Sequence, residues 1–305
     1  MPPARRLAHT LGFDVDHLAD GSRMTQTDGA TPRRTPRARS YLMCPPEHFT
    51  VQYAINPWMD PARPVDTARA MAQWRVLRET FTGLGHQVRT ISPEPGLPDM
   101  VFAANGATVI GGKVLGARFR YPQRQPESAA YRRWFERSGF PPAVPPDCVN
   151  EGEGDIVFAG RSIIAGYGFR TDEAAAPQVA GLFGLPVASV RLVDPRFYHL
   201  DTALCVLDAD TAAYYPAAFD DAARAVLSSL FAELIEVKDT DAEWLGLNAV
   251  SDGRHVVLPA EADGLAAQLA ATGFEPVRVD MSEFLKAGGG PKCCTLELRS
   301  QEEWA

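Results

Sequence analysis

The stretch Ile156-Val157-Phe158-Ala159-Gly160-Arg161-Ser162-Ile163-Ile164-Ala165 predicts two short strands joined by a tight turn, because β-branched and aromatic residues flank a Gly-Arg pair. The same pattern recurs in three further places, at residues 107–115, 203–215 and 248–258. Successive turns are about 49, 49 and 43 residues apart, which is typical of a repeated supersecondary unit.

A helical pattern follows each hairpin, and in most units one more strand follows the helix. The helices are expected at residues 128–137, 173–182, 219–230 and 261–271, and the later strands at 187–190, 234–237 and 276–279. A fifth unit can be assembled from the two ends of the chain, with strands near Leu42 and Leu296 and a helix over residues 66–81. We predict an α/β fold, a closed five-bladed propeller of these units, because closure removes exposed sheet edges. An open α/β sheet is the alternative.

Composition narrows the class of protein. The chain has 305 residues, of which 46% are hydrophobic, as in a soluble globular protein. Its net charge of −8 does not suggest an extended nucleic-acid surface, and no apolar run is long enough for a membrane span. The chain has an odd number of cysteines, five, of which four are widely scattered, and this favours a reducing compartment such as the cytoplasm. Residues 1–38 are expected to form a disordered or loosely attached arm, and residues 39–305 a single catalytic domain.

The run Gly288-Gly289-Gly290-Pro291-Lys292-Cys293-Cys294 is the first candidate for chemistry. Three glycines allow the backbone to turn tightly and to pass close to a ligand. A thiolate is a strong nucleophile, and a nearby cation or oriented amides lower its pKa. The structural alternative is a glycine loop that ends in two buried cysteines.

Three more polar clusters stand at comparable places in the repeat. They are Asp99 with Asn105, then Glu151, Glu153 and Asp155, and then His199. Each has a structural alternative, as turn caps, as a weak metal loop, or as a core histidine. Units arranged around an axis would bring these loops together, and a cysteine nucleophile needs a histidine and a carboxylate beside it. A substrate carboxylate would need an arginine, and Arg124 and Arg170 are available in loops.

These motifs, in this order, resemble those of the guanidino-group-modifying, or pentein, superfamily, over about residues 40–300. The resemblance implies a closed array of five ββαβ units. It also implies Cys293 as the nucleophile, His199 as general acid and base, and Glu151 as the partner of the histidine, with Glu153 as the alternative. The implied substrate-binding residues are Asp155 at the guanidinium, Asp99 at the distal nitrogens or the amino group, Arg124 and Arg170 at the carboxylate, and Asn56 in Tyr-Ala-Ile-Asn-Pro-Trp-Met.

The informative departure is Asn105. Dimethylarginine hydrolases and arginine deiminases resemble each other in carrying aspartate there, and asparagine resembles the arginine dihydrolase branch. An asparagine both donates and accepts, so it can also hold a neutral ureido group. We therefore expect an arginine dihydrolase that forms ornithine, carbon dioxide and ammonia and needs no metal or organic cofactor. The alternatives are a dimethylarginine hydrolase or deiminase that stops at citrulline, an amidinotransferase, and a non-catalytic arginine-binding sensor. The expected partner is a small guanidino substrate, and a homo-oligomer is compatible with the sequence.

Overall fold

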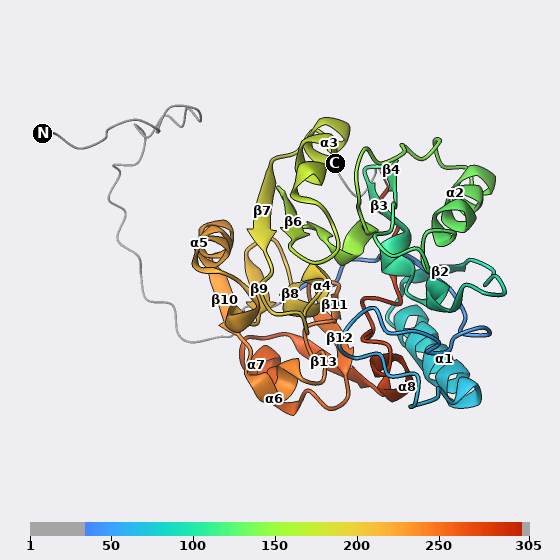
Figure 1. The fold of residues 1–305 in the computed structure, drawn as a ribbon. Helices are drawn as coiled ribbons and strands as arrows, with labels where there is room; N and C mark the ends of the chain where they lie inside the picture. The colour runs from blue at the N-terminus through green and yellow to red at the C-terminus, as the bar shows by residue number, and fades with distance from the viewer. Residues whose placement is uncertain (1–33, 301–305) are drawn as a thin grey trace, which may run out of the picture. The chain divides into compact units, whose positions relative to one another are not determined.

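The computed structural model describes residues 34–300, which contain five separate sheets. Four of the sheets have three strands, in which one strand pairs antiparallel with the second and the second pairs parallel with the third. Figure 1 shows helices α1, α2, α3, α5 and α7 toward the outside of this domain and the strands between them. The expected α/β fold with a repeated hairpin, helix and strand is confirmed.

The elements of the five units follow the predicted pattern closely. The unit from both chain ends contains β14 (Leu296–Glu297), β1 (Ser40–Met43), α1 (Thr67–Gly83) and β2 (Gln87–Thr90). The next contains β3 (Ala107–Ile110), β4 (Lys113–Gly116) and α2 (Glu127–Arg137). The third unit contains β5 (Ile156–Phe158), β6 (Ile163–Tyr167), α3 (Ala176–Phe183) and β7 (Val187–Arg191). The fourth contains β8 (Leu204–Val206), β9 (Thr211–Tyr214), α5 (Asp221–Leu230) and β10 (Glu233–Glu236). The fifth contains β11 (Val250–Ser251), β12 (His255–Pro259), α7 (Asp263–Ala271) and β13 (Glu275–Val279).

The second unit has only two strands, β3 and β4, in its sheet. A single parallel bridge from Leu115 to Val144 occupies the place of the third strand. Its turn uses Gly111 and Gly112 with φ of 58° and 74°, which is the left-handed region that a two-residue hairpin turn requires. The Gly-Gly pair therefore fixes the register Ile110 to Lys113.

Short helical turns lie directly before the first strand of several units. They are η2 (Ala103–Gly106) before β3, η3 (Gly152–Gly154) before β5, and α4 (Leu200–Ala203) before β8. The remaining short helices are α6 (Asp239–Ala242), α8 (Ser282–Leu285), η1 (Pro98–Val101), η4 (Glu173–Ala175) and η5 (Pro216–Ala218). Turns η2 and η3 contact each other and α4 contacts η3, so the segments that carry the predicted site residues meet.

The expected arm falls mostly outside the described residues. Within them, Arg34 forms an ion pair with Asp208 and lies 4.0 Å from the centre of the Phe274 ring. The backbone N–H of Arg37 donates to the carbonyl of Asp252 at 2.8 Å. Residues 34–38 therefore contact the domain in the part of the chain that the structure describes. No helix in the described part of the chain is long and apolar enough to cross a membrane.

Candidate active site

The loop that carries Cys293 depends on its glycines because neighbouring groups leave no room for side chains. A Cβ on Gly289 would lie 2.2 Å from a ring carbon of Phe102, and one on Gly290 would lie 3.0 Å from Oδ1 of Asn248. The loop therefore packs closely against two other units of the fold. It places the Cys293 side chain in the interior, with 2% of its surface exposed.

The Cys293 thiol lies between an amide and a carboxylate. Its Sγ is 3.1 Å from Nδ2 of Asn248 and 3.5 Å from Oδ2 of Asp201. Burial raises the pKa of Cys293 well above its ordinary value, and the charge of Asp201 raises it further. The raised pKa favours the thiol form of Cys293, and a cation bound beside Sγ would favour the thiolate. Lys292 does not supply that cation, because its Nζ binds Glu153 and the carbonyl of Thr295.

His199 pairs with Glu151. Its Nε2 lies 2.7 Å from Oε2 of Glu151, and the same oxygen accepts from Nη1 of Arg170 at 2.9 Å. Burial opposes ionisation of the carboxyl, but Arg170 and His199 outweigh it and hold the pKa of Glu151 well below its usual range. Nδ1 of His199 is buried and has no partner among the described residues, so it is free to exchange a proton with a bound molecule.

The two glutamates around Gly152 have different surroundings. Glu153 forms ion pairs with Lys292, at 2.8 Å, and with Arg299, and accepts from the backbone N–H of Glu297 at 3.0 Å. It joins the cysteine loop to the last strand. Glu151, which we favoured as the partner of His199, is the glutamate that the geometry places there.

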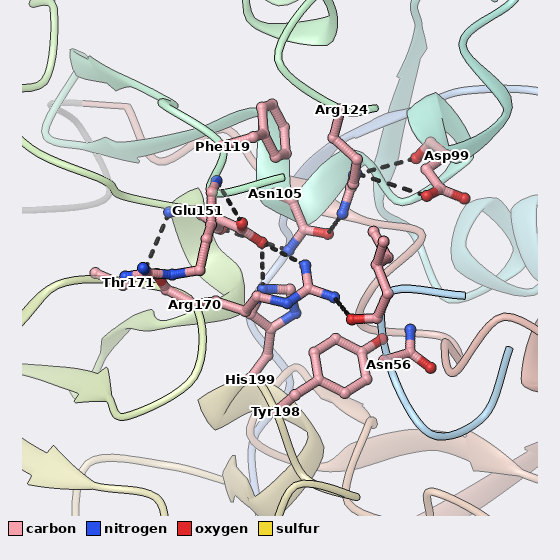
Figure 2. Close-up of polar contacts among 12 residues, drawn as sticks. Asn56, Asp99, Asn105, Phe119, Arg124, Glu151, Arg170, Thr171, Tyr198 and His199 are labelled. Carbon is pink, nitrogen blue, oxygen red and sulfur yellow. Dashed lines mark hydrogen bonds and ion pairs between the residues drawn. The ribbon is translucent and has the colours of Figure 1, made fainter. Parts of the chain in front are cut away.

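Asp99, Asn105 and Arg124 form a second buried group (Figure 2). Nη1 of Arg124 donates to Oδ1 of Asn105 at 2.7 Å, and Nδ2 of Asn105 is 3.4 Å from the carbonyl of Glu151. Oδ2 of Asp99 accepts from the hydroxyl of Tyr53 at 2.9 Å, whereas its Oδ1 is buried without a partner among the described residues. That oxygen is an acceptor in need of a donor such as a guanidinium or ammonium group.

The two arginines are engaged to different extents. Arg124 binds Glu127 through two nitrogens, at 3.0 and 2.9 Å, in addition to Asn105 and the carbonyl of Asp99. Arg170 has fewer hydrogen bonds, to Glu151 and to the carbonyl of Ile55. Figure 2 shows its guanidinium above the ring of Tyr198, at 4.6 Å from the ring centre. Arg170 therefore keeps more donors for a ligand, and Arg124 holds the surrounding side chains in place.

Asp155 binds the protein backbone with both of its oxygens. Oδ1 accepts from the N–H of Leu200 at 3.0 Å, and Oδ2 accepts from the N–H of Thr171 at 3.1 Å. It thereby fixes the backbone next to His199. Asp201, to which the sequence analysis assigned no role, is the carboxylate that contacts Cys293. Burial raises the pKa of Asp201 to about 6.

Asn56 links the long segment between β1 and α1 to the cysteine loop. Its Nδ2 donates to the carbonyl of Ala287 at 3.1 Å, and its Oδ1 accepts from the N–H of Trp58 at 2.9 Å. A Cβ on Gly288 would lie 3.1 Å from Asn56 Oδ1, so this segment touches the start of the loop. Asn56 thus lies beside the group of site residues rather than at Cys293.

Three residues of the site were missed from the sequence: Tyr53, Asp201 and Asn248. Asp201 follows His199 by two residues, and Asn248 stands before β11 as Asn105 stands before β3. Their position in the repeat could have identified both. Tyr53 gave no such signal. In the described residues no group of three or more His, Cys, Asp or Glu side chains could hold a metal ion.

The chain is similar in sequence and in fold to several known proteins. A family model described as "N,N dimethylarginine dimethylhydrolase, eukaryotic" matches residues 46–300. An N(G),N(G)-dimethylarginine dimethylaminohydrolase of Mycobacterium tuberculosis is 56% identical over 270 residues, which cover 88% of this chain and 89% of that protein.

A second relative is the bifunctional arginine dihydrolase/ornithine cyclodeaminase ArgZ of Synechocystis. It is 39% identical over 263 residues, which cover 84% of this chain but 37% of that longer protein. The crystal structure of the N-terminal domain of ArgZ, an arginine dihydrolase, bound to substrate superposes with a TM-score of 0.82 at 37% identity. That match covers 86% of this chain and 98% of the solved one.

Proposed function

Because this chain belongs to the N,N-dimethylarginine dimethylhydrolase family and is a guanidino-group hydrolase, we propose that it hydrolyses arginine twice, to ornithine, carbon dioxide and two equivalents of ammonia. The observation that carries the second round is the neutral amide of Asn105, which stands beside Glu151 in the buried site. The named activity of ArgZ supports it.

The first round begins when the guanidinium binds beside Cys293. Its positive charge, near Asp201, lowers the pKa of the Cys293 thiol, and the thiol proton passes to His199. The thiolate attacks the guanidinium carbon, and His199 delivers a proton to the departing nitrogen, which leaves as ammonia. The product is an alkylthiouronium bonded to Sγ, and Glu151 stabilises the charged imidazole.

Water then completes the round. His199 takes a proton from a water molecule, and the hydroxide attacks the same carbon. The carbon–sulfur bond breaks, the thiol is restored, and citrulline with a neutral ureido group remains.

The second round needs the site to retain a neutral group. The thiolate attacks the ureido carbon, a second ammonia leaves, and water releases a carbamate, which loses carbon dioxide to give ornithine. Aspartate at position 105 would add a negative charge near Glu151 and favour cations over the ureido group. Asparagine adds none, and its Nδ2 can donate to the ureido oxygen. Its Oδ1 is fixed by Arg124, which orients that donor.

The substrate contacts follow from the free donors and acceptors. Arg170 would bind the α-carboxylate, and Asp99 the amino group or the distal nitrogens. Asp201 takes the place at the guanidinium that we assigned to Asp155, because it contacts Cys293 while Asp155 binds backbone. Asn56 would close the side of the pocket near Ala287.

A second candidate is dimethylarginine hydrolysis, and the 56% identity to the Mycobacterium tuberculosis protein favours it. It uses the same chemistry with dimethylamine as the leaving group and stops at citrulline. The experiment is incubation with arginine and, separately, with dimethylarginine, followed by amino-acid analysis. Ornithine from arginine supports the dihydrolase, whereas citrulline with dimethylamine from the methylated substrate supports the second candidate. An amidinotransferase would instead need an added amine acceptor.

We also infer that the five units close into a ring, because β14 from the end of the chain pairs with β1 from its beginning. Polar segments before β3, β5, β8, β11 and β14 would then meet around one axis, which agrees with their contacts. Five free cysteines, of which four are buried, fit a reducing compartment such as the cytoplasm. A crystal structure and the cellular fraction that contains the protein would test these two inferences.

A further inference from the structure

Each unit of the fold contributes a polar side chain from the segment before its first strand. The segments before β3, β5, β8 and β14 supply Asn105, Glu151, His199 and Cys293, all used above. The segment before β11 supplies Asn248, to which no role has been given. It is fully buried, with 0% of its surface exposed.

The amide of Asn248 makes four hydrogen bonds. Oδ1 accepts from the backbone N–H of Gly290 and of Cys293, both at 2.9 Å. Nδ2 donates to the carbonyl of Asp201 and to Sγ of Cys293, both at 3.1 Å. The two N–H donors and the carbonyl acceptor fix which end of the amide carries oxygen, so a donor faces the thiol.

The backbone around Asn248 is held as firmly as its side chain. Leu245 has φ of 51°, which is rare for a branched side chain, and its carbonyl accepts from the N–H of Asn248 at 2.8 Å. Strained conformations of this kind are found where the surrounding structure determines a functional position.

Neither aspartate nor leucine could make the four hydrogen bonds of this amide. Aspartate would turn an oxygen toward the carbonyl of Asp201 and toward the sulfur, and leucine would leave two buried N–H groups unpaired. Burial of the Cys293 thiol and the charges of Asp201 and of the neighbouring Cys294 raise its pKa, whereas hydrogen bonds from the backbone of Gly290 and from the side chain of Asn248 lower it.

We propose that Asn248 positions the nucleophile, by clamping the cysteine loop through Oδ1 and by donating an Nδ2 hydrogen bond that stabilises the Cys293 thiolate. This inference rests on the proposed role of Cys293 as the attacking group. It adds no step to the reaction, and it assigns the donor that the sulfur anion requires once its proton has left.

The test measures thiol reactivity without substrate. Iodoacetamide alkylation of Cys293 is followed from about pH 6 to pH 10 by peptide mass spectrometry, in the wild type and in Asn248→Asp and Asn248→Ala. Asn248→Asp keeps an acceptor for the two loop N–H groups and removes the donor; Asn248→Ala removes both and introduces no charge. Ser251→Ala is the matched control, because it removes side-chain hydrogen bonds from β11 that do not reach the cysteine loop.

We expect alkylation at pH 7 to slow about tenfold or more in both Asn248 variants, with the pH profile moved upward, and to stay unchanged in Ser251→Ala. With arginine, kcat should fall more than KM rises. The proposal would be overturned if an Asn248 variant that melts cooperatively were alkylated at Cys293 as fast as the wild type. It would also be overturned if Ser251→Ala slowed the alkylation as much as the Asn248 variants do. If the Asn248 variants lose Cys293 reactivity but the wild type does not turn over arginine, the proposed function is refuted and the role of Asn248 at the thiol is supported.

Discussion

Replacing Glu151 by glutamine tests the His199–Glu151–Arg170 group, because it keeps the shape of the side chain and removes its charge. The carboxylate accepts from His199 at 2.7 Å, from Arg170 at 2.9 Å and from the N–H of Arg120 at 3.0 Å. Without the negative charge of Glu151, the guanidinium of Arg170 has no counter-ion, and only 2% of the surface of Arg170 is exposed. Leaving such a charge unpaired costs about 3–5 kcal/mol.

Catalysis should fall as well, since the imidazole loses the group that orients and charges it. General acid–base contributions of this kind are ~10²–10⁴-fold, and we expect kcat for arginine to drop by about that factor. The assays are urea unfolding and steady-state production of ammonia. Glu153→Gln is the control, because Glu153 binds Lys292 and Arg299 rather than His199, and its kcat should fall by less than about tenfold.

The pH dependence gives a sign that can be checked. The pKa of Glu151 is held below its usual range in the folded protein, so its contribution to stability is present above the unfolded value of about 4.3. That contribution is lost as the pH falls through the pKa that Glu151 has in the folded protein. The stability difference between wild type and Glu151→Gln should therefore shrink below about pH 4. Unchanged kcat in Glu151→Gln, or an equal loss in Glu153→Gln, would refute the assignment of Glu151.

Two further substitutions probe the cysteine loop. Gly289→Ala places a Cβ 2.2 Å from the Phe102 ring and should lower the free energy of unfolding by about 1–3 kcal/mol, with a matching loss of kcat. Gly181→Ala is the control, because a Cβ there meets nothing within 4 Å and should cause neither loss. Thermal melts compare the two variants. Asp201→Asn removes a charge that raises the pKa of Cys293, so iodoacetamide should alkylate the free enzyme faster while turnover of arginine falls. Burial raises the pKa of Asp201 to about 6, so the free energy of unfolding falls as the pH rises from about 4 through 6. Asp201→Asn should therefore be more stable than the wild type above pH 6, which urea titrations would measure.

Most of the helices and strands could be predicted because residues close in the sequence determine where they begin and end. The hairpin of β5 and β6 follows from Gly160, with φ of 73°, between two apolar runs, and helix α1 begins where Asp66 accepts from the N–H of Arg69. The pairing of β1 with β14 followed from the repeat once one unit was assembled from the two chain ends.

The missed elements depend on contacts distant in sequence. Helix α4 occupies Leu200–Ala203, so β8 begins at Leu204, one residue later than expected. That single turn is held by Asp155, which accepts from the N–H of Leu200 and lies 45 residues earlier in the chain. No local pattern records such a bond.

The site shows the same limit. Cys293, His199 and Glu151 could be selected because their residue types carry chemistry and their motifs resemble a known family. Asn248 looked like the start of a strand, yet it bonds to a cysteine 45 residues away, and β11 begins only at Val250. The choice between Glu151 and Glu153 likewise depends on which of them reaches His199, which spacing alone does not determine.

The central claim is that Cys293 forms a covalent bond to the guanidinium carbon of arginine. We would mix the wild-type protein with arginine, quench in acid within milliseconds, and determine the mass of the peptide that contains Cys293. The account predicts a substrate-derived adduct on that peptide, absent in Cys293→Ser and longer-lived in Glu151→Gln. Steady turnover of arginine with no adduct on Cys293, or with an adduct on another cysteine, would contradict it.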